Sequence, residues 1–243
     1  MSNVLILTCG RARHENPWAY IEALLPQIDA EKAPLPHFGI VCDGPYSGPR
    51  PPGWTIHEYH RPPAPDGATV IKGNKWAYWR LLEIGVELGG DLVALEDDIA
   101  LSKNAIRRMA TFLVPPDLAW VQFFSPQTFT QPNTWPGIWR PPEGSSLFLQ
   151  AAKYPSWALR KLVDWSTSEK FLQYAASDQA LALAARCLEL RYGSHCPDLV
   201  QHMGEISEAN PTEKLSPDWR MSRCWGGTQF DSLSLYQRDD LYR

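Results

Sequence analysis

The sequence predicts an α/β protein built on a single open, mostly parallel sheet flanked by helices. Short continuous apolar runs, which are typical of buried strands, alternate along the chain with longer segments of helical periodicity. One apolar run begins close to Met1, and another ends abruptly in three consecutive carboxylates, Glu96, Asp97 and Asp98. Because open α/β sheets bind ligands at the carboxyl ends of their strands, these acids indicate the edge where we expect a site.

The composition is that of an ordinary globular protein. The chain has 243 residues, 44% of them hydrophobic, and a net charge of −4, which favours one large domain. No apolar run approaches the roughly 18 residues that cross a bilayer, so we expect no association with a membrane. The first residues lack the features of a signal peptide, so a cytoplasmic location is expected. The five cysteines show no metal-binding spacing, and Cys9 and Cys42 are expected to be buried thiols.

The elements of the amino-terminal half follow from periodicity and turn signals. A first strand is expected at residues 4–8, and a helical pattern then passes through Trp18, Ile21 and Leu25. The next apolar run ends at Asp43, followed by Gly and Pro, which is a strong turn signal. The other elements expected here are strands at 38–42 and 54–59, a helix at 74–88 and the acidic strand at 92–95. The predicted order is therefore β-α-β-β-α-β.

The carboxyl-terminal half is expected to continue the sheet around one long loop. Residues 125–142 are rich in Pro, Trp and Thr without periodicity, which predicts a lid or a substrate-binding insertion. Ser102 is a plausible N-cap for the helix that follows the acids. The tail, residues 210–243, has no clean pattern. The predicted elements are helices at 104–112, 157–165 and 178–190, and strands at 119–124, 146–151 and 198–204.

Three adjacent acids at a strand end have two interpretations. They repel one another unless a hard divalent cation or protonation compensates them, which indicates a metal site. Alternatively, they form a solvated turn before the next helix. Thr8 and Asp43 would end their strands at the same sheet edge, with Arg11 close by, and this set of groups suits a nucleotide and a metal. Neither G-x-G-x-x-G nor G-x-x-x-x-G-K-[ST] occurs, which disfavours dinucleotide dehydrogenases and P-loop NTPases.

With these residues placed, the chain resembles the GT-A glycosyltransferases. Their Rossmann-like sheet ends in an acidic D-x-D motif, which holds a divalent ion on the diphosphate of a sugar nucleotide. Residues 96–98 match this motif, with Glu at the first position. The resemblance implies that Asp98 binds Mn²⁺ or Mg²⁺ and that Glu96 faces the donor, a UDP-sugar. The other residues implied at the donor site are Thr8, Arg11, Asp43, Lys75 and Asp97.

A second segment carries the resemblance into the carboxyl-terminal half. Ser177-Asp178-Gln179, followed later by His202-Met-Gly, resembles N-acetylglucosaminyltransferase-like bacterial and phage enzymes. The resemblance implies that Asp178 is the base of an inverting transfer, in which the attacking hydroxyl must lose its proton. It also implies that His202 is a metal ligand. Alternatively, Asp178 only suits a helix amino terminus, His202 is a hydrogen-bonded core residue and Asp43 is a turn residue. The resemblance covers residues 3–207.

The expected GT-A domain spans residues 1–209, divided into a nucleotide-binding half (1–100) and an acceptor half (101–209), and the tail would pack near the active site. Acceptor contacts are expected from Trp-rich loops at 125–142 and 156–157 and from the tail. The compact chain resembles phage enzymes that glycosylate 5-hydroxymethylcytosine in DNA, which favours hydroxymethylated DNA as acceptor. The net charge opposes tight nonspecific DNA binding, although the chain offers a set of basic residues at 11, 13, 72, 75, 107, 108, 220 and 223.

Other functions also remain compatible with the sequence. A glycosyltransferase of this kind could act on a glycan, a protein or a small molecule instead of DNA. Outside that class, the same acids suit a catalytically inactive sugar-nucleotide-binding module or a metal-dependent nucleotidyltransferase. The products that each would release distinguish these classes.

Overall fold

A computed structural model describes residues 2–9, 18–31, 37–60, 73–125, 137–139, 149–168, 171, 177–196 and 198–203. Four strands in its amino-terminal half pair in parallel. They are β1 (Ser2–Cys9), β2 (Phe38–Asp43), β3 (Thr55–Tyr59) and β4 (Asp91–Glu96). Three of them, β1, β2 and β4, are the continuous apolar runs typical of buried parallel strands. β1 lies between β2 and β4, and its side chains are buried on both faces of the sheet.

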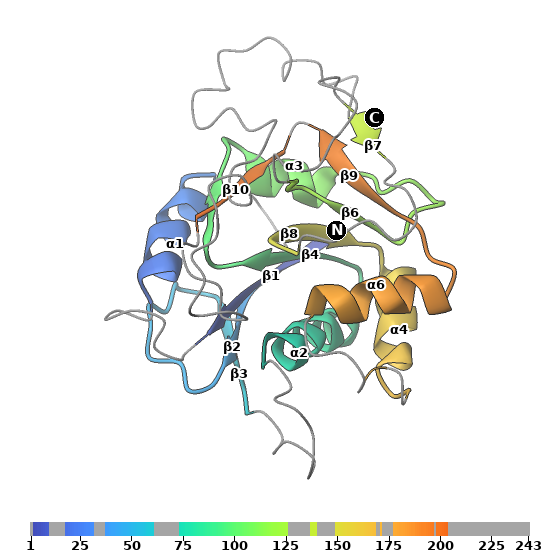
Figure 1. Cartoon of the computed structure of the whole chain (residues 1–243). Helices are drawn as coiled ribbons and strands as arrows, with labels where there is room; N and C mark the ends of the chain where they lie inside the picture. The colour runs from blue at the N-terminus through green and yellow to red at the C-terminus, as the bar shows by residue number, and fades with distance from the viewer. Residues whose placement is uncertain are drawn as a thin grey trace.

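The carboxyl-terminal half extends this sheet with strands of both directions. The sheet has eight strands in the order β3-β2-β1-β4-β8-β6-β9-β7 (Figure 1). β8 runs antiparallel to β4 and β6, and β7 runs antiparallel to β9, while β6 and β9 are parallel. These strands are β6 (Trp120–Gln122), β7 (Gly137–Trp139), β8 (Ala151–Tyr154) and β9 (Tyr192–Cys196). The predicted α/β class with a mostly parallel sheet is confirmed.

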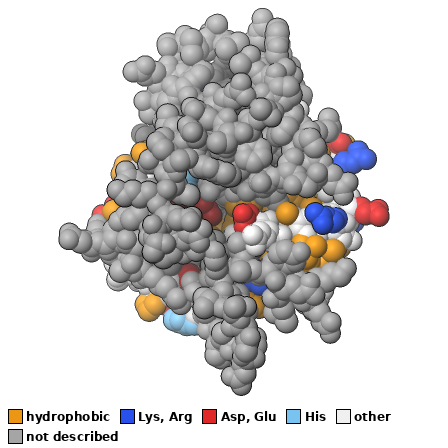
Figure 2. All heavy atoms as spheres, viewed as in Figure 1, with side chains coloured by type: hydrophobic (Ala, Val, Ile, Leu, Met, Phe, Trp, Pro, Cys, Tyr) orange, Lys and Arg blue, Asp and Glu red, His pale blue; other side chains and the backbone are white. Residues whose placement is uncertain are grey.

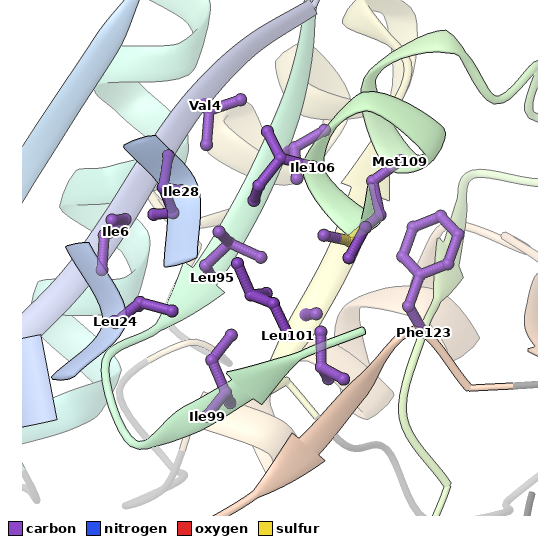
Figure 3. Close-up of a cluster of buried hydrophobic side chains, with 14 of the residues drawn as sticks. Val4, Ile6, Leu24, Ile28, Leu95, Ile99, Leu101, Ile106, Met109 and Phe123 are labelled. Carbon is purple, nitrogen blue, oxygen red and sulfur yellow. The ribbon is translucent and has the colours of Figure 1, made fainter. Parts of the chain in front are cut away.

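Helices cover both faces of the sheet because side chains of β1 alternate between two apolar clusters. Val4 and Ile6 pack with α1 (Ala19–Glu31) and α3 (Ala105–Thr111), as Figure 3 shows. Leu5 and Leu7 pack on the other face, in the cluster to which the remaining helices contribute. Those helices are α2 (Gly73–Leu88), α4 (Ser156–Trp165) and α6 (Ser177–Cys187). No helix within the described residues is long and apolar enough to cross a membrane.

Two further short strands form a separate antiparallel pair beside the main sheet. They are β5 (Ile99–Leu101) and β10 (Val200–His202). β5 lies directly after the acidic triplet, where the sequence predicts no strand. The helix that follows does not use Ser102 as N-cap, because Asn104 holds that position in a left-handed conformation with φ of 57°. Ser102 instead accepts a hydrogen bond from the backbone N–H of Ala105 through its carbonyl oxygen.

Several other predicted boundaries change in the structure. Of the strand predicted at 146–151, residues 149–151 are described, and only Ala151 belongs to a strand, because β8 begins there. The loop predicted at 125–142 contains β7, which pairs with the unpredicted strand β9. Cys42 is buried, as expected, whereas the side chain of Cys9 is outside the described residues. The tail, residues 210–243, also lies outside them.

The start of α4 lies at the sheet edge opposite the acids. β8 is antiparallel to β4, and Tyr154 pairs with Leu92, near the amino end of β4. Asp91 then accepts a hydrogen bond from the backbone N–H of Ser156 through Oδ1, at 3.1 Å. Trp157, which is 41% exposed, therefore follows the amino edge of β4. The structure thus places residues 156–157 at the sheet edge opposite the acids, and their contact with an acceptor stays a prediction.

Candidate active site at the carboxyl edge of the sheet

The strand register brings the ends of β1, β2 and β4 to one edge. Cys9 pairs with Asp43 across β1 and β2, and Leu7 pairs with Glu96 across β1 and β4. Thr8, Asp43 and the acidic triplet therefore converge from three strands, because parallel neighbours end on the same side. Acidic side chains are visible in the middle of the molecular face in Figure 2. Arg11, the other residue expected here, lies outside the described residues.

Asp98 and His202 meet although they are 104 residues apart in the sequence. The pairing of β5 with β10 sets His202 opposite Ile99, next to Asp98. The backbone N–H of Met203 also donates to the carbonyl oxygen of Asp98, at 2.7 Å. These backbone contacts bring Nε2 of His202 to 3.0 Å from Oδ2 of Asp98, and both side chains are buried. A carboxylate and an imidazole are thus held side by side at the sheet edge.

Asp97 has a different neighbour from Asp98. Thr8 donates through Oγ1 to Oδ2 of Asp97 at 2.5 Å, and both residues are buried. This bond ties the end of β1 to the turn after β4. Glu96 is only half-buried, and it accepts a hydrogen bond from Nε2 of Gln150 at 3.2 Å. The three acids therefore occupy distinct environments, with Asp98 paired to the histidine and Glu96 the most accessible.

Two polar residues of α1 hold the segment after Asp98, and sequence reasoning missed both. Gln27 accepts a hydrogen bond from the backbone N–H of Leu101 at 2.8 Å, across 74 residues of sequence. Glu31 accepts from the backbone N–H groups of Ile106 and Arg107 at the start of α3. Burial raises the pKa of Glu31, although these hydrogen bonds act in the opposite direction. Nothing in the local sequence pattern signals these contacts, because their partners are distant along the chain.

Lys75, expected beside a diphosphate, binds a backbone carbonyl instead. Its ammonium group donates from Nζ to the carbonyl oxygen of Phe171 at 2.9 Å, and the residue is fully buried. Nζ lies 4.4 Å from the ring centroid of Phe171 and 5.2 Å from that of Trp76. Burial lowers the pKa of Lys75. In this structure Lys75 therefore joins α2 to the Phe171 backbone, and a donor contact remains a prediction.

The buried ammonium group of Lys75 predicts a pH dependence of stability. Because its pKa is lowered in the folded chain, the unfolded chain binds more protons between that pKa and the ordinary lysine value of 10.5. The free energy of unfolding is therefore expected to gain a positive contribution with rising pH in this interval, and Lys75→Met should remove it. Urea unfolding of both proteins at several alkaline pH values measures the difference, with Lys161→Met on α4 as an exposed control. Identical pH dependence of wild type and Lys75→Met would refute this contribution.

Asp178 is exposed in the first turn of α6, where a negative charge suits the helix amino terminus. Oδ1 also accepts a hydrogen bond from the backbone N–H of Gln179 at 2.8 Å. The carboxylate is thus accessible to solvent. Its expected role as a base and its expected place in the helix amino terminus are compatible with each other.

The side-chain oxygen of Asp98 and the ring nitrogen of His202 are suitable ligands for a hard or borderline divalent cation. Two ligand atoms that lie at right angles and about 2.1 Å from an octahedral ion are about 3.0 Å apart. Oδ2 of Asp98 and Nε2 of His202 have this separation, 3.0 Å. No group of three His, Cys, Asp or Glu suited to a metal occurs among the described residues. Two protein ligands are consistent with an ion that completes its coordination with substrate phosphates and water.

Comparisons with known proteins give similar folds at low identity. No protein-family model matches the chain, and no curated protein matches its sequence. Galactosyltransferase LgtC, solved with donor and acceptor sugar analogues, is 10% identical with a TM-score of 0.49, over 100% of this chain and 95% of that one. The catalytic domain of Drosophila β1,4-galactosyltransferase 7, solved with xylobiose, is 9% identical with a TM-score of 0.47, over 90% and 78%. A nucleoside-diphosphate-sugar pyrophosphorylase from Vibrio cholerae is 13% identical with a TM-score of 0.45, over 85% and 97%. Because identity and TM-score are low in all three cases, the function is inferred from the chain's own residues.

Proposed function

We propose that the chain is a divalent-metal-dependent glycosyltransferase that moves a sugar from a nucleoside-diphosphate sugar, such as a UDP-sugar, to an acceptor hydroxyl. The observation that carries this proposal is the buried contact between Asp98 and His202 at the edge where β1, β2 and β4 end. Carboxylate and imidazole ligands suit Mn²⁺, and carboxylate with phosphate oxygens suits Mg²⁺. The site combines these ligands with further polar groups for the donor.

The residues of this edge would have separate tasks in the proposed reaction. Asp98 and His202 would hold the ion, which neutralises charge on the departing diphosphate when bound. Asp43 would accept hydrogen bonds from the ribose or the base, and Glu96 would face the donor. The Thr8–Asp97 hydrogen bond would keep the β1 end and the acidic turn in register during binding. Arg11 would meet a phosphate oxygen.

Asp178 is the proposed base of an inverting transfer, and its replacement gives a direct prediction. Asp178→Asn should reduce turnover by about a hundredfold or more, because general base catalysis typically contributes that much. Donor and Mn²⁺ affinity should stay unchanged. Steady-state rates and calorimetry measure the two effects, and Asp164→Asn on α4 provides an exposed carboxylate control. Unchanged turnover in Asp178→Asn would remove the base assignment while leaving the donor site intact.

The class of reaction is tested by its products. The metal-stripped chain is titrated with several UDP- and GDP-sugars, with and without Mn²⁺, and then incubated with acceptors. A glycosyltransferase binds one donor in a metal-dependent manner and releases a nucleoside diphosphate. A nucleotidyltransferase would release pyrophosphate or a nucleoside monophosphate, and an inactive binding module would release neither. Absence of metal-dependent binding for every donor contradicts the proposal.

The acceptor that we propose is the 5-hydroxymethyl group of cytosine in DNA, on the sequence resemblance to phage DNA glycosyltransferases. Arg107 and Arg108 lie on α3 among the basic residues expected at a DNA surface, whereas Lys75 is buried and does not contribute to such a surface. A base in duplex DNA must leave the stack before its hydroxymethyl group reaches the site. Nucleoside mass spectrometry of hydroxymethylated DNA after incubation tests this acceptor. No mass increase with any donor would favour a glycan, protein or small-molecule hydroxyl instead.

A further inference from the structure

Two histidines come together on the α2 face of the sheet, away from the acidic edge. His37 directly precedes β2, and His57 lies within β3 opposite Val41. Side chains alternate along a strand, so residues 37, 39 and 41 share one face, and His57 shares it through its pairing with Val41. Val41 belongs to the apolar cluster to which α2 contributes. His37 therefore lies at the amino end of β2 and His57 is level with Val41, whereas Asp43 of the candidate active site ends that strand.

Gly39 makes room for this pair. The two imidazole rings have centroids 6.4 Å apart and planes inclined at 53°. A Cβ atom at Gly39 would lie 3.2 Å from Nε2 of His37 and 2.8 Å from Cδ2 of Leu5. A side chain at this position would thus crowd the ring of His37. The absence of one leaves space for the two rings to approach each other.

The Nε2 atoms of His37 and His57 are both buried and have no hydrogen-bond partner. A buried polar atom without a hydrogen bond is energetically unfavourable, so a ligand shared by these two nitrogen atoms would stabilise the pair. Burial lowers the pKa of both histidines, and at His57 the neighbouring His37 and Arg80 act in the same direction while Glu87 opposes them. A lowered pKa favours the neutral form of each ring, which is the form that binds metal ions.

We propose that His37 and His57 form a second metal site, which binds a borderline divalent ion such as Zn²⁺ through both Nε2 atoms. With Zn–N of about 2.0–2.1 Å, two imidazoles that share an ion have centroids at most about 6.4 Å apart, and about 5.2 Å apart at a tetrahedral angle. The observed 6.4 Å is at this upper limit, so binding at a tetrahedral angle requires the two ring centroids to approach each other by about 1.2 Å. Water completes the coordination, since no third His, Cys, Asp or Glu joins the pair among the described residues.

The ligand chemistry separates this site from the proposed catalytic one. Two imidazoles without a carboxylate favour Zn²⁺, Ni²⁺ or Cu²⁺ and disfavour Mg²⁺ and Mn²⁺, which prefer oxygen ligands. Asp98 and His202 supply the oxygen-containing set. The two sites therefore respond to different ions and to different substitutions, and the zinc site holds whether or not the chain transfers a sugar.

Zinc titration of the untagged, metal-stripped chain tests the proposal. Wild type is expected to bind one zinc ion that the double variant His37→Ala/His57→Ala loses, and calorimetry with elemental analysis counts the ions. His60→Ala removes an exposed histidine just beyond β3 and should keep this ion. Mn²⁺ binding should be unchanged in the double variant, and Asp98→Ala should retain the zinc ion. Equal zinc stoichiometry in wild type and the double variant would overturn the proposal.

A second measurement covers the case in which the double variant fails to fold. X-ray absorption of the zinc-loaded Asp98→Ala chain should show scattering from two imidazoles, and single His57→Gln should reduce it to one or lose the ion. A zinc environment without two imidazoles, or no zinc retained by Asp98→Ala, contradicts the assignment. In that case an ordered water between the rings would explain the two buried nitrogen atoms.

Discussion

Asp98→Asn is expected to abolish metal-dependent donor binding and to reduce turnover by about a hundredfold or more, since loss of a metal ligand removes the charge stabilisation of the leaving group. The amide has nearly the same shape as the carboxylate, so the contact with His202 and the β5–β10 pairing should persist. Calorimetry with Mn²⁺ and a UDP-sugar measures binding, and release of nucleoside diphosphate measures turnover. Asp29→Asn on the exposed side of α1 is the matched control.

The same variant separates the two interpretations of the acidic triplet. If residues 96–98 form only a solvated turn, Asp98→Asn leaves metal and donor binding unchanged. His202→Gln extends the comparison, because it removes the imidazole and leaves the carboxylate in place. If Asp98 and His202 are ligands of one metal ion, either substitution weakens Mn²⁺ binding. If they form only a structural hydrogen bond, either substitution changes the stability alone.

Trp79→Ala is expected to give the largest loss of stability, about 3–5 kcal/mol, because a buried indole leaves a large cavity. Trp79 is 1% exposed and packs against Trp165 and Phe171, with ring centroids 6.1 and 4.8 Å away. Its Nε1 also donates to the carbonyl oxygen of Leu162 at 3.3 Å. The substitution therefore loosens contacts from α2 to α4 and to the Phe171 position together. Urea unfolding measures the change in the free energy of unfolding.

The control for this substitution is the exposed Trp157 of α4. Trp157→Ala removes an indole of the same size whose side chain contacts solvent and Lys161, and surface changes usually alter stability by about 0.5 kcal/mol or less. Similar losses for the two variants would show that the buried cluster around Trp79 contributes less than its burial implies.

The sequence predicted elements whose apolar pattern is local. β1, β2 and α2 appear within one or two residues of their predicted limits, because each buries a continuous run or a periodic face. The strand predicted at 198–204 appears as β10, whereas its short partner β5 was not predicted and pairs only with β10 across the chain. β9 similarly depends on two partners, β6 and β7. Such strands are weakly encoded locally, since their hydrogen bonds come from distant segments.

For the candidate site, the sequence likewise predicted the residues at strand ends but not the contacts between distant segments. The strand register explains why Thr8, Asp43 and Glu96 could be grouped from sequence, because each follows an apolar run at the same edge. His202 was connected to Asp98 by the family resemblance and not by any periodicity. The direction of the Lys75 side chain depends on the backbone of Phe171, which no local pattern identifies. The site features that were not predicted depend on contacts between residues that are far apart in the sequence.

The β5–β10 pair has a consequence for the order in which the molecule is assembled. Forming it brings together segments separated by about a hundred residues. Closing a loop of this length lowers the entropy of the chain before the new contacts stabilise it. The β1–β2–β4 core requires no residue beyond Glu96. A chain in which only these strands have paired has Glu96 at its edge, but it lacks the imidazole that lies beside Asp98 in the complete fold. The acidic edge therefore receives its histidine only when the two halves of the chain pair.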